Sequence, residues 1–166
     1  MQNSNNKIKP LNQIVEIASK LKSHNKKIVT TNGVFDILHL GHVNYLEEAK
    51  KLGDVLIVGI NSDASVRQIK GPKRPINSEE CRAGILAGLA SVDYVFIFDD
   101  SNPSSWIEKI KPNIHAKASD YRMEQIMEKE TVEKNNGKVV LINAEKQYST
   151  TKLIEKILEV YKKIQP

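Results

Sequence analysis

A continuous apolar run, Val55-Leu-Ile-Val-Gly-Ile60, follows Asp54 and narrows the folds open to this sequence. A strand with one solvated face alternates apolar and polar residues, whereas a strand covered on both faces of a parallel sheet is apolar throughout. The run therefore predicts a strand over residues 54–60. Helical and strand-like segments alternate on either side of it, which is typical of α/β proteins. We expect a single Rossmann-like, doubly wound parallel sheet with helices on both faces.

Residue spacing and turn signals predict the other elements. Strands are expected at 28–31, 94–98, 113–116 and 138–142, and helices at 11–23, 41–52, 63–69, 78–90, 103–110 and 122–135. Ser149-Thr-Thr151 begins a last helix, whose apolar stripe comprises Leu153, Ile154, Ile157, Leu158 and Tyr161. We divide the chain into an N-terminal helical extension, residues 1–26, packed on a domain of residues 27–166.

The composition of the 166 residues limits the environment and the chemistry. One cysteine, Cys81, excludes an internal disulfide and a multi-cysteine metal site. No apolar stretch approaches the ~20 residues of a membrane helix, and the N-terminus lacks the apolar region of a secretory signal. We expect a cytoplasmic protein without a membrane partner. The net charge of +5 suits an anionic partner, but the basic residues are spread along the chain, which favours solvated helix faces as their explanation.

Two histidines follow the first predicted strand, within Thr30-Thr-Asn-Gly-Val-Phe-Asp-Ile-Leu-His-Leu-Gly-His42. The stretch is not a Walker A loop, and no Gly-x-Gly-x-x-Gly occurs in the chain. His39 and His42 lie at the predicted start of a helix, where the helix dipole favours an anion such as a polyphosphate. Two other interpretations stay open: core or capping histidines, or two metal ligands, although no third ligand follows at a recognisable spacing.

The residues around this pair resemble those of the cytidylyltransferase-like nucleotidyltransferase superfamily, whose hallmark is His-x-Gly-His after the first strand. Within it, the chain is most similar to the heptose 1-phosphate adenylyltransferases. The motifs that carry the resemblance are Thr31–Lys50, Gly53-Asp54, Val58–Ser65, Lys70-Gly-Pro-Lys-Arg-Pro75, Arg82, Val92-Asp-Tyr-Val95 and Tyr148-Ser-Thr-Thr151. They span roughly residues 27–160, which is nearly the whole chain.

The resemblance implies that a sugar phosphate oxygen attacks the α-phosphate of ATP, so that pyrophosphate leaves and an ADP-sugar forms. A reaction of this kind depends on positioning and charge stabilisation. The implied catalytic residues are His39, His42, Lys70 and Lys73, the lysines lying on a Pro-bounded loop that is otherwise an exposed basic turn. The implied cofactor is Mg²⁺, held mainly by the ATP phosphates. A homodimer without nucleic acid is the implied assembly.

The resemblance also implies the binding residues. Nucleotide contacts are expected from Thr31, Asn32, Gly33, Val34, Phe35, His39, Gly41, His42, Lys117, Asp120, Tyr121, Ser149, Thr150 and Thr151. Substrate contacts are expected from Asp36, Asp63, Arg74 and Arg82, and Asp36 is also expected to organise its loop. Simple helix capping is the alternative for Asp63, and a surface ion pair with Glu79 is the alternative for Arg82.

The sequence departs from the family pattern at the fourth loop, where Lys117-Ala-Ser-Asp-Tyr121 replaces Lys-Gly-Gly-Asp-Tyr. A side chain is unfavourable where the backbone has a positive φ or where a ligand approaches it closely. The sequence therefore leaves undecided which nucleotide base is bound and how its phosphates fit. His115, in place of an apolar strand residue, is interpreted as a core or edge histidine. Three alternatives remain: a cytidylyltransferase for glycerol 3-phosphate or another alcohol phosphate, an FAD synthetase-type adenylyltransferase, and a non-catalytic nucleotide or RNA binder.

Overall fold

The computed structural model describes residues 4–100, 102–119, 126–143 and 148–162. Its five strands form one parallel sheet in the order β3-β2-β1-β4-β5. The strands are β1 (Ile28–Gly33), β2 (Val55–Asn61), β3 (Tyr94–Phe98), β4 (Ile114–Ala118) and β5 (Lys138–Ile142). The helices are η1 (Ser4–Lys7, 3-10), α1 (Leu11–Ser23), α2 (Leu40–Lys51), α3 (Asp63–Lys70), α4 (Glu79–Ala87), α5 (Ser104–Ile110), α6 (Lys129–Lys134) and α7 (Thr150–Lys162). The predicted doubly wound α/β sheet is confirmed.

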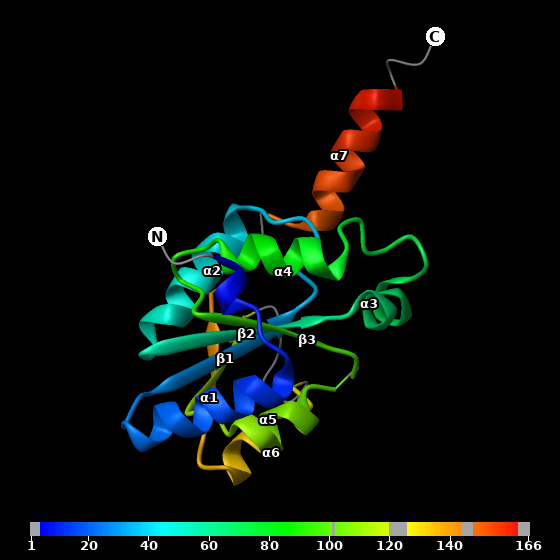
Figure 1. The fold of residues 1–166 in the computed structure, drawn as a ribbon. Helices are drawn as coiled ribbons and strands as arrows, with labels where there is room; N and C mark the ends of the chain where they lie inside the picture. The colour runs from blue at the N-terminus through cyan, green and yellow to red at the C-terminus, as the bar shows by residue number, and fades with distance from the viewer. Residues whose placement is uncertain (1–3, 101, 120–125, 144–147, 163–166) are drawn as a thin grey trace.

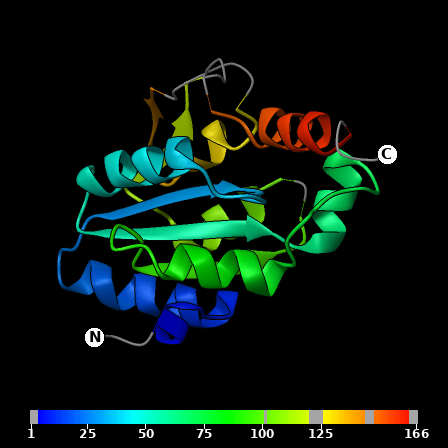
Figure 2. The ribbon, with the colours of Figure 1, turned by 90° about the horizontal axis from the view of Figure 1, so that it is seen from above.

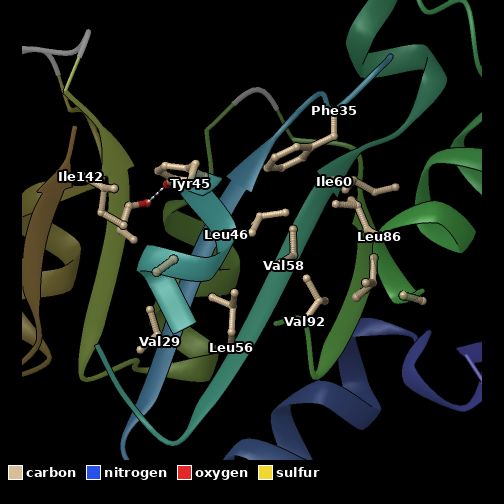
Figure 3. Close-up of a cluster of buried hydrophobic side chains, with 14 of the residues drawn as sticks. Val29, Phe35, Tyr45, Leu46, Leu56, Val58, Ile60, Leu86, Val92 and Ile142 are labelled. Atoms are coloured by element: carbon tan, nitrogen blue, oxygen red, sulfur yellow. Dashed lines mark hydrogen bonds between the residues drawn. The ribbon is translucent and has the colours of Figure 1, made fainter. Parts of the chain in front are cut away.

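Helices cover the sheet on both faces, with α2 and α4 above it and α1, α5 and α6 below it in Figure 1. Seen from above, β1 and β2 are visible between α2 and α4 (Figure 2). Side chains alternate along β2, so that Leu56 and Val58 enter the upper hydrophobic cluster while Ile57 enters the lower one. Figure 3 shows Leu46 of α2 and Leu86 of α4 in the upper cluster. Both faces of β2 are therefore buried, as its continuous apolar sequence predicts.

The switch point of the sheet lies between β1 and β4. From β1 the chain proceeds to β2 on one side, and the later strands β4 and β5 are added on the other side. In such sheets, ligands bind beyond the carboxyl ends of the strands at this point. The loops after β1 and β4 are thereby brought to the same edge.

Two helices differ from their predicted bounds by more than one residue. The helix predicted at 122–135 is α6, which begins only at Lys129, because Ile126 and Glu128 turn into the interior before it. The helix predicted to run to about Ala90 ends at Ala87, where the N–H of Gly88 bonds to the carbonyl oxygens of the last turn. The N-cap of this helix is Ser78, whose hydroxyl accepts a hydrogen bond from the Cys81 N–H.

Helix α7 extends away from the sheet (Figure 1) and buries none of its side chains. The C-terminal part of its apolar stripe is exposed, with Ile157 44%, Leu158 52% and Tyr161 65% accessible, whereas Leu153 and Ile154 are half-buried. The spacing correctly indicates an amphipathic helix, but the partner of its apolar face is not the sheet of the same chain.

Candidate active site

His39 and His42 stack on each other at the N-terminus of α2. Their ring centroids are 3.8 Å apart with an interplanar angle of 14°. His39 is the extended N-cap residue and His42 lies one turn further, so both rings leave the helix on the same side. A Cβ at Gly41 would lie 3.2 Å from His39 Nδ1 and 3.0 Å from the Tyr148 Cβ, so glycine leaves room for both neighbours.

The backbone before the histidines is bent at Phe35, whose φ of 47° is in the left-handed region. Its ring is buried and packs edge-on against His42, with centroids 5.2 Å apart. A non-glycine residue in this conformation carries a cost that its surroundings must offset. Here the buried contact of Phe35 with His42 fixes the histidine ring in the cavity.

Burial keeps both imidazoles neutral. It lowers the pKa of His39, and burial together with the repulsion that a protonated His39 would exert lowers the pKa of His42 to about 4. The Nδ1 atoms of both rings are buried without a hydrogen-bond partner among the described residues. Buried polar atoms are normally paired, so this arrangement is one that a ligand would complete.

The pair opens into a cavity of about 730 Å³ at the carboxyl edge of the sheet. Of the residues assigned to the site from sequence, those lining it are Asn32, Gly33, Val34, Phe35, Asp36, His39, Gly41, His42, Lys70, Arg74, Lys117, Ser149, Thr150 and Thr151. Tyr45, Asn61, Ile126 and Glu128 also line it, although sequence reasoning did not select them. Asp120 and Tyr121 lie outside the described residues.

Asp36 ties the basic loop at 71–77 to the loop after β1. Its buried carboxylate accepts hydrogen bonds from the Arg74 Nε and from the backbone N–H groups of Ile76 and Asn77. Burial alone would raise the pKa of Asp36, but these backbone and guanidinium donors outweigh it and the pKa is lowered. Asp36 thus organises its loop, as expected, and its carboxylate faces the protein's own donors instead of a substrate.

Arg82 lies in the interior and not in the cavity. It is 0% exposed and donates to the carbonyl oxygens of Val34, Asn61 and Asn77 and to the Asp63 carboxylate. Arg82 is therefore an internal link between four segments of the chain. The sequence predicts a substrate contact or a surface ion pair with Glu79, and the structure places the side chain in neither position. A guanidinium has five donors, which suits it to joining several carbonyl groups.

Three other predicted residues also lie outside the cavity lining. The Asp63 carboxylate faces Arg82, and the N-cap of α3 is Ser62 and not Asp63. The Thr31 hydroxyl is buried against the Tyr45 hydroxyl at 2.7 Å. Lys73 is exposed on the basic loop, while Lys70, the last residue of α3, and Arg74 of the loop line the cavity. The predicted basic loop thus approaches the site through two of its three cations.

The N-terminus of α7 closes another side of the cavity. The Ser149 hydroxyl accepts from the Lys152 N–H, and the Thr150 hydroxyl donates to the Ile37 carbonyl in the loop before α2. The Tyr148 ring lies 6.2 Å from the His39 ring. Two helix N-termini, those of α2 and α7, therefore converge on the cavity, and both favour an anion there.

The end of β4 accommodates Ala118 and Ser119 without strain. Neither residue has a positive φ, and the Ser119 N–H donates to the Ile142 carbonyl at 2.8 Å, which continues the pairing with β5. Glycine is therefore not required by the backbone at these two positions. His115, further back on β4, is a core histidine with 0% exposure.

No group of three or more potential metal ligands gathers among the residues that the structure describes. The two carboxylates lining the cavity, Asp36 and Glu128, are paired with Arg74 and Lys117. No helix in the described part of the chain is long and apolar enough to cross a membrane.

We expect nucleotide binding at this site to take up protons. A bound polyphosphate would favour the imidazolium form of His42, so its pKa would rise from about 4 towards neutrality in the complex. Binding is then tighter at lower pH, and the dissociation constant should fall as the pH is lowered from about 8 to about 5. Calorimetry in buffers of different ionisation enthalpy measures the uptake directly. His42→Asn supplies the control for protons taken up by the nucleotide itself, and equal uptake by both proteins would contradict the assignment.

Comparison with known proteins agrees with this geometry. A family model described as cytidylyltransferase-like matches residues 30–156. The bifunctional protein HldE of Geobacter metallireducens is 49% identical over 158 residues, which cover 95% of this chain and 32% of that protein. HldE of Campylobacter jejuni is 51% identical over 142 residues, covering 86% of this chain and 30% of that protein. The chain thus spans about a third of the length of these curated relatives.

Two solved structures share the fold. A lipopolysaccharide core biosynthesis protein from Thermoplasma volcanium has a TM-score of 0.61 and 31% identity, covering 75% of this chain and 99% of its own. A pantoate-beta-alanine ligase from Francisella tularensis has the same TM-score of 0.61 at 20% identity, covering 93% of this chain and 78% of its own. The second likeness concerns the fold alone.

Proposed function

Because the chain belongs to the cytidylyltransferase-like family of nucleotidyltransferases, we propose that it transfers AMP from ATP to a sugar 1-phosphate and releases pyrophosphate. The acceptor we propose is D-glycero-β-D-manno-heptose 1-phosphate, and the product is ADP-heptose. The observation that carries the reaction class is the stacked His39–His42 pair, whose buried Nδ1 atoms lack partners at the mouth of α2.

In the proposed reaction, a phosphate oxygen of the sugar attacks the α-phosphorus of ATP. A bond forms between that oxygen and the α-phosphorus, and the bond from the α-phosphorus to the bridging oxygen of the β-phosphate breaks. Pyrophosphate leaves with the electron pair of the broken bond. Negative charge shifts onto the leaving group, so hydrogen-bond donors fixed in a water-poor site lower the barrier. His39 and His42 supply such donors, and the N-terminus of α2 adds its positive end.

Other residues of the cavity add positive charge and hydrogen-bond donors that would face the phosphates. Lys70 lines the cavity from the end of α3 and Arg74 from the basic loop, and Asp36 holds that loop in place through Arg74. Ser149, Thr150 and Thr151 present the N-terminus of α7 to the outer phosphates. Lys73, exposed on the same loop, would reach a phosphate only if the loop closed over it.

Mg²⁺ belongs to the proposal as a partner of the nucleotide. We propose that phosphate oxygens and water hold most of its coordination positions. When bound, it would neutralise charge on the triphosphate. Chelation is then expected to abolish turnover while leaving the fold unchanged.

The heptose assignment is supported by the resemblance of motifs over residues 27–160 and by identities of 49% and 51% to the two HldE proteins. It is tested by measuring pyrophosphate release with ATP, CTP and GTP against heptose 1-phosphate, other sugar 1-phosphates, glycerol 3-phosphate and FMN. Turnover with ATP and heptose 1-phosphate is the expected result. Turnover with CTP or with another acceptor would retain the mechanism and reject the proposed substrates, whereas no turnover by folded protein would reject both.

We further propose a cytoplasmic homodimer in which α7 packs on its counterpart in a second copy. The exposed part of the apolar stripe of α7 supports this, because no other described residue of the chain covers Ile157, Leu158 and Tyr161. Light scattering should give twice the monomer mass of 18.7 kDa. Leu158→Glu should reduce it to the monomer mass, and Lys156→Glu, an exposed position of the same helix, should not. A monomeric native protein would contradict the dimer.

A further inference from the structure

A chain of polar side chains runs from the core to the cavity between β1 and β4. The Glu128 Oε1 atom lies 2.8 Å from the Lys117 Nζ and 3.2 Å from the His115 Nε2. The His115 Nδ1 lies 2.9 Å from the Thr30 hydroxyl, and the Lys117 ammonium donates to the Asn32 Oδ1 at 3.2 Å. Five polar side chains are thus joined in one row.

The protonation of this row follows from burial and geometry. Burial lowers the pKa of His115, so its ring is neutral. Burial by itself would raise the pKa of Glu128, but the His115 hydrogen bond and the Lys117 charge outweigh it and lower the pKa to about 2. An ionised carboxylate only accepts hydrogen bonds, so the His115 proton is on Nε2 and points at Glu128. The His115 Nδ1 then accepts from the Thr30 hydroxyl.

The two ends of the row differ in what they face. Thr30 and His115 are fully buried and are not among the residues that line the cavity. Asn32, Lys117 and Glu128 line the cavity, and Glu128, which is 3% exposed, joins the buried end of the row to the cavity end. A buried ion pair contributes little net stability, because the loss of hydration offsets the attraction between the charges. Its effect here is to restrict where the Lys117 ammonium can lie.

We propose that Glu128, braced by His115, is a positioning residue that holds the Lys117 ammonium beside Asn32 for the bound nucleotide. Glu128 acts through Lys117 and does not itself touch the reacting phosphate. This inference rests on the proposed function, because the ligand that Lys117 would contact is the nucleotide. It adds two residues, Glu128 and His115, which the sequence motifs do not select.

The test measures ATP dissociation constants by calorimetry, and kcat and KM with the best acceptor, for Glu128→Gln, Lys117→Met and the double variant. The amide of Glu128→Gln keeps the shape of the side chain and removes its charge. We expect the dissociation constant and KM for ATP to rise roughly tenfold and kcat to change by less than about twofold. In the Lys117→Met background, Glu128→Gln should then have an effect of less than about twofold on ATP affinity. Glu133→Gln, which breaks an exposed ion pair with Lys129, is the matched control. It should leave the ATP dissociation constant, KM and kcat unchanged.

The outcomes separate the inference from the proposed function. A wild-type protein that fails to bind ATP would overturn the proposed function. If the wild type binds ATP and Glu128→Gln binds it equally well, the positioning role alone is overturned. The same holds if Glu128→Gln weakens ATP binding by the same factor with Lys117 present and with Lys117→Met, since a purely structural role does not depend on Lys117. A readout independent of ATP is the ¹⁵N shift pattern of His115, which should report the Nε2-protonated neutral ring in the wild type. An Nδ1-protonated ring would contradict the proposed row.

Discussion

Replacing His42 with alanine is expected to lower kcat by about 10²–10³-fold, because one fixed donor to the charge of the transition state is removed. The fold should survive. The variant loses the edge contact with Phe35, but it also removes a buried nitrogen that has no partner among the described residues. The measurement is steady-state pyrophosphate release, with circular dichroism to confirm that the variant is folded.

His24→Ala is the matched control for this change, because His24 is exposed at the C-terminal end of α1 and is not among the residues that line the cavity. It should leave kcat unchanged. A folded His42→Ala protein with wild-type turnover would remove the stacked pair from the mechanism. A fall of the same size in His24→Ala would point to a general loss of stability instead.

Replacing Arg82 with methionine is expected to destabilise the protein by about 3–5 kcal/mol, which is typical when one partner of a buried charged network is removed. The carbonyl oxygens of Val34 and Asn61 would lose their donor, and the Asp63 carboxylate would lose its cation. Chemical denaturation measures the free energy of unfolding. Arg67→Met, at an exposed position of α3, should change it by less than about 0.5 kcal/mol.

The Arg82 experiment also separates the two roles considered for this residue. An internal link predicts a large loss of stability, with activity retained in whatever fraction of the protein stays folded. A substrate contact predicts normal stability with a raised KM for the acceptor. The second result would contradict the interior placement of Arg82.

The strands were predictable because their signals are local. Residues 94–98 and 138–142 are predicted with the observed bounds of β3 and β5, since each is a short apolar run between turn residues. Helix α7 was also predictable as a helix. The exposure of its apolar stripe was not, because spacing shows which side of a helix is apolar and not what covers it.

The residues of the candidate site were predictable where they belong to a motif that is continuous in the sequence. Contacts between segments that are distant in the sequence were not predictable. The loop from Asn32 to His42 and the residues Ser149–Thr151 do line one cavity. The acceptors of Arg82 are mostly backbone carbonyl groups, which no residue pattern reveals. Glu128 lies within the helix predicted at 122–135, whereas in the structure it precedes α6 and its contacts with His115 and Lys117 of β4 hold it in the interior.

The most direct test of the central claim is which phosphorus of ATP is attacked. ATP labelled with ³²P at the α-position is incubated with heptose 1-phosphate, Mg²⁺ and the purified protein, and the products are separated and identified by mass. The account predicts that the label enters ADP-heptose, with one unlabelled pyrophosphate released for each molecule formed. Labelled ADP together with a heptose bisphosphate would show attack at the γ-phosphate, and that result would contradict adenylyl transfer at the His39–His42 site.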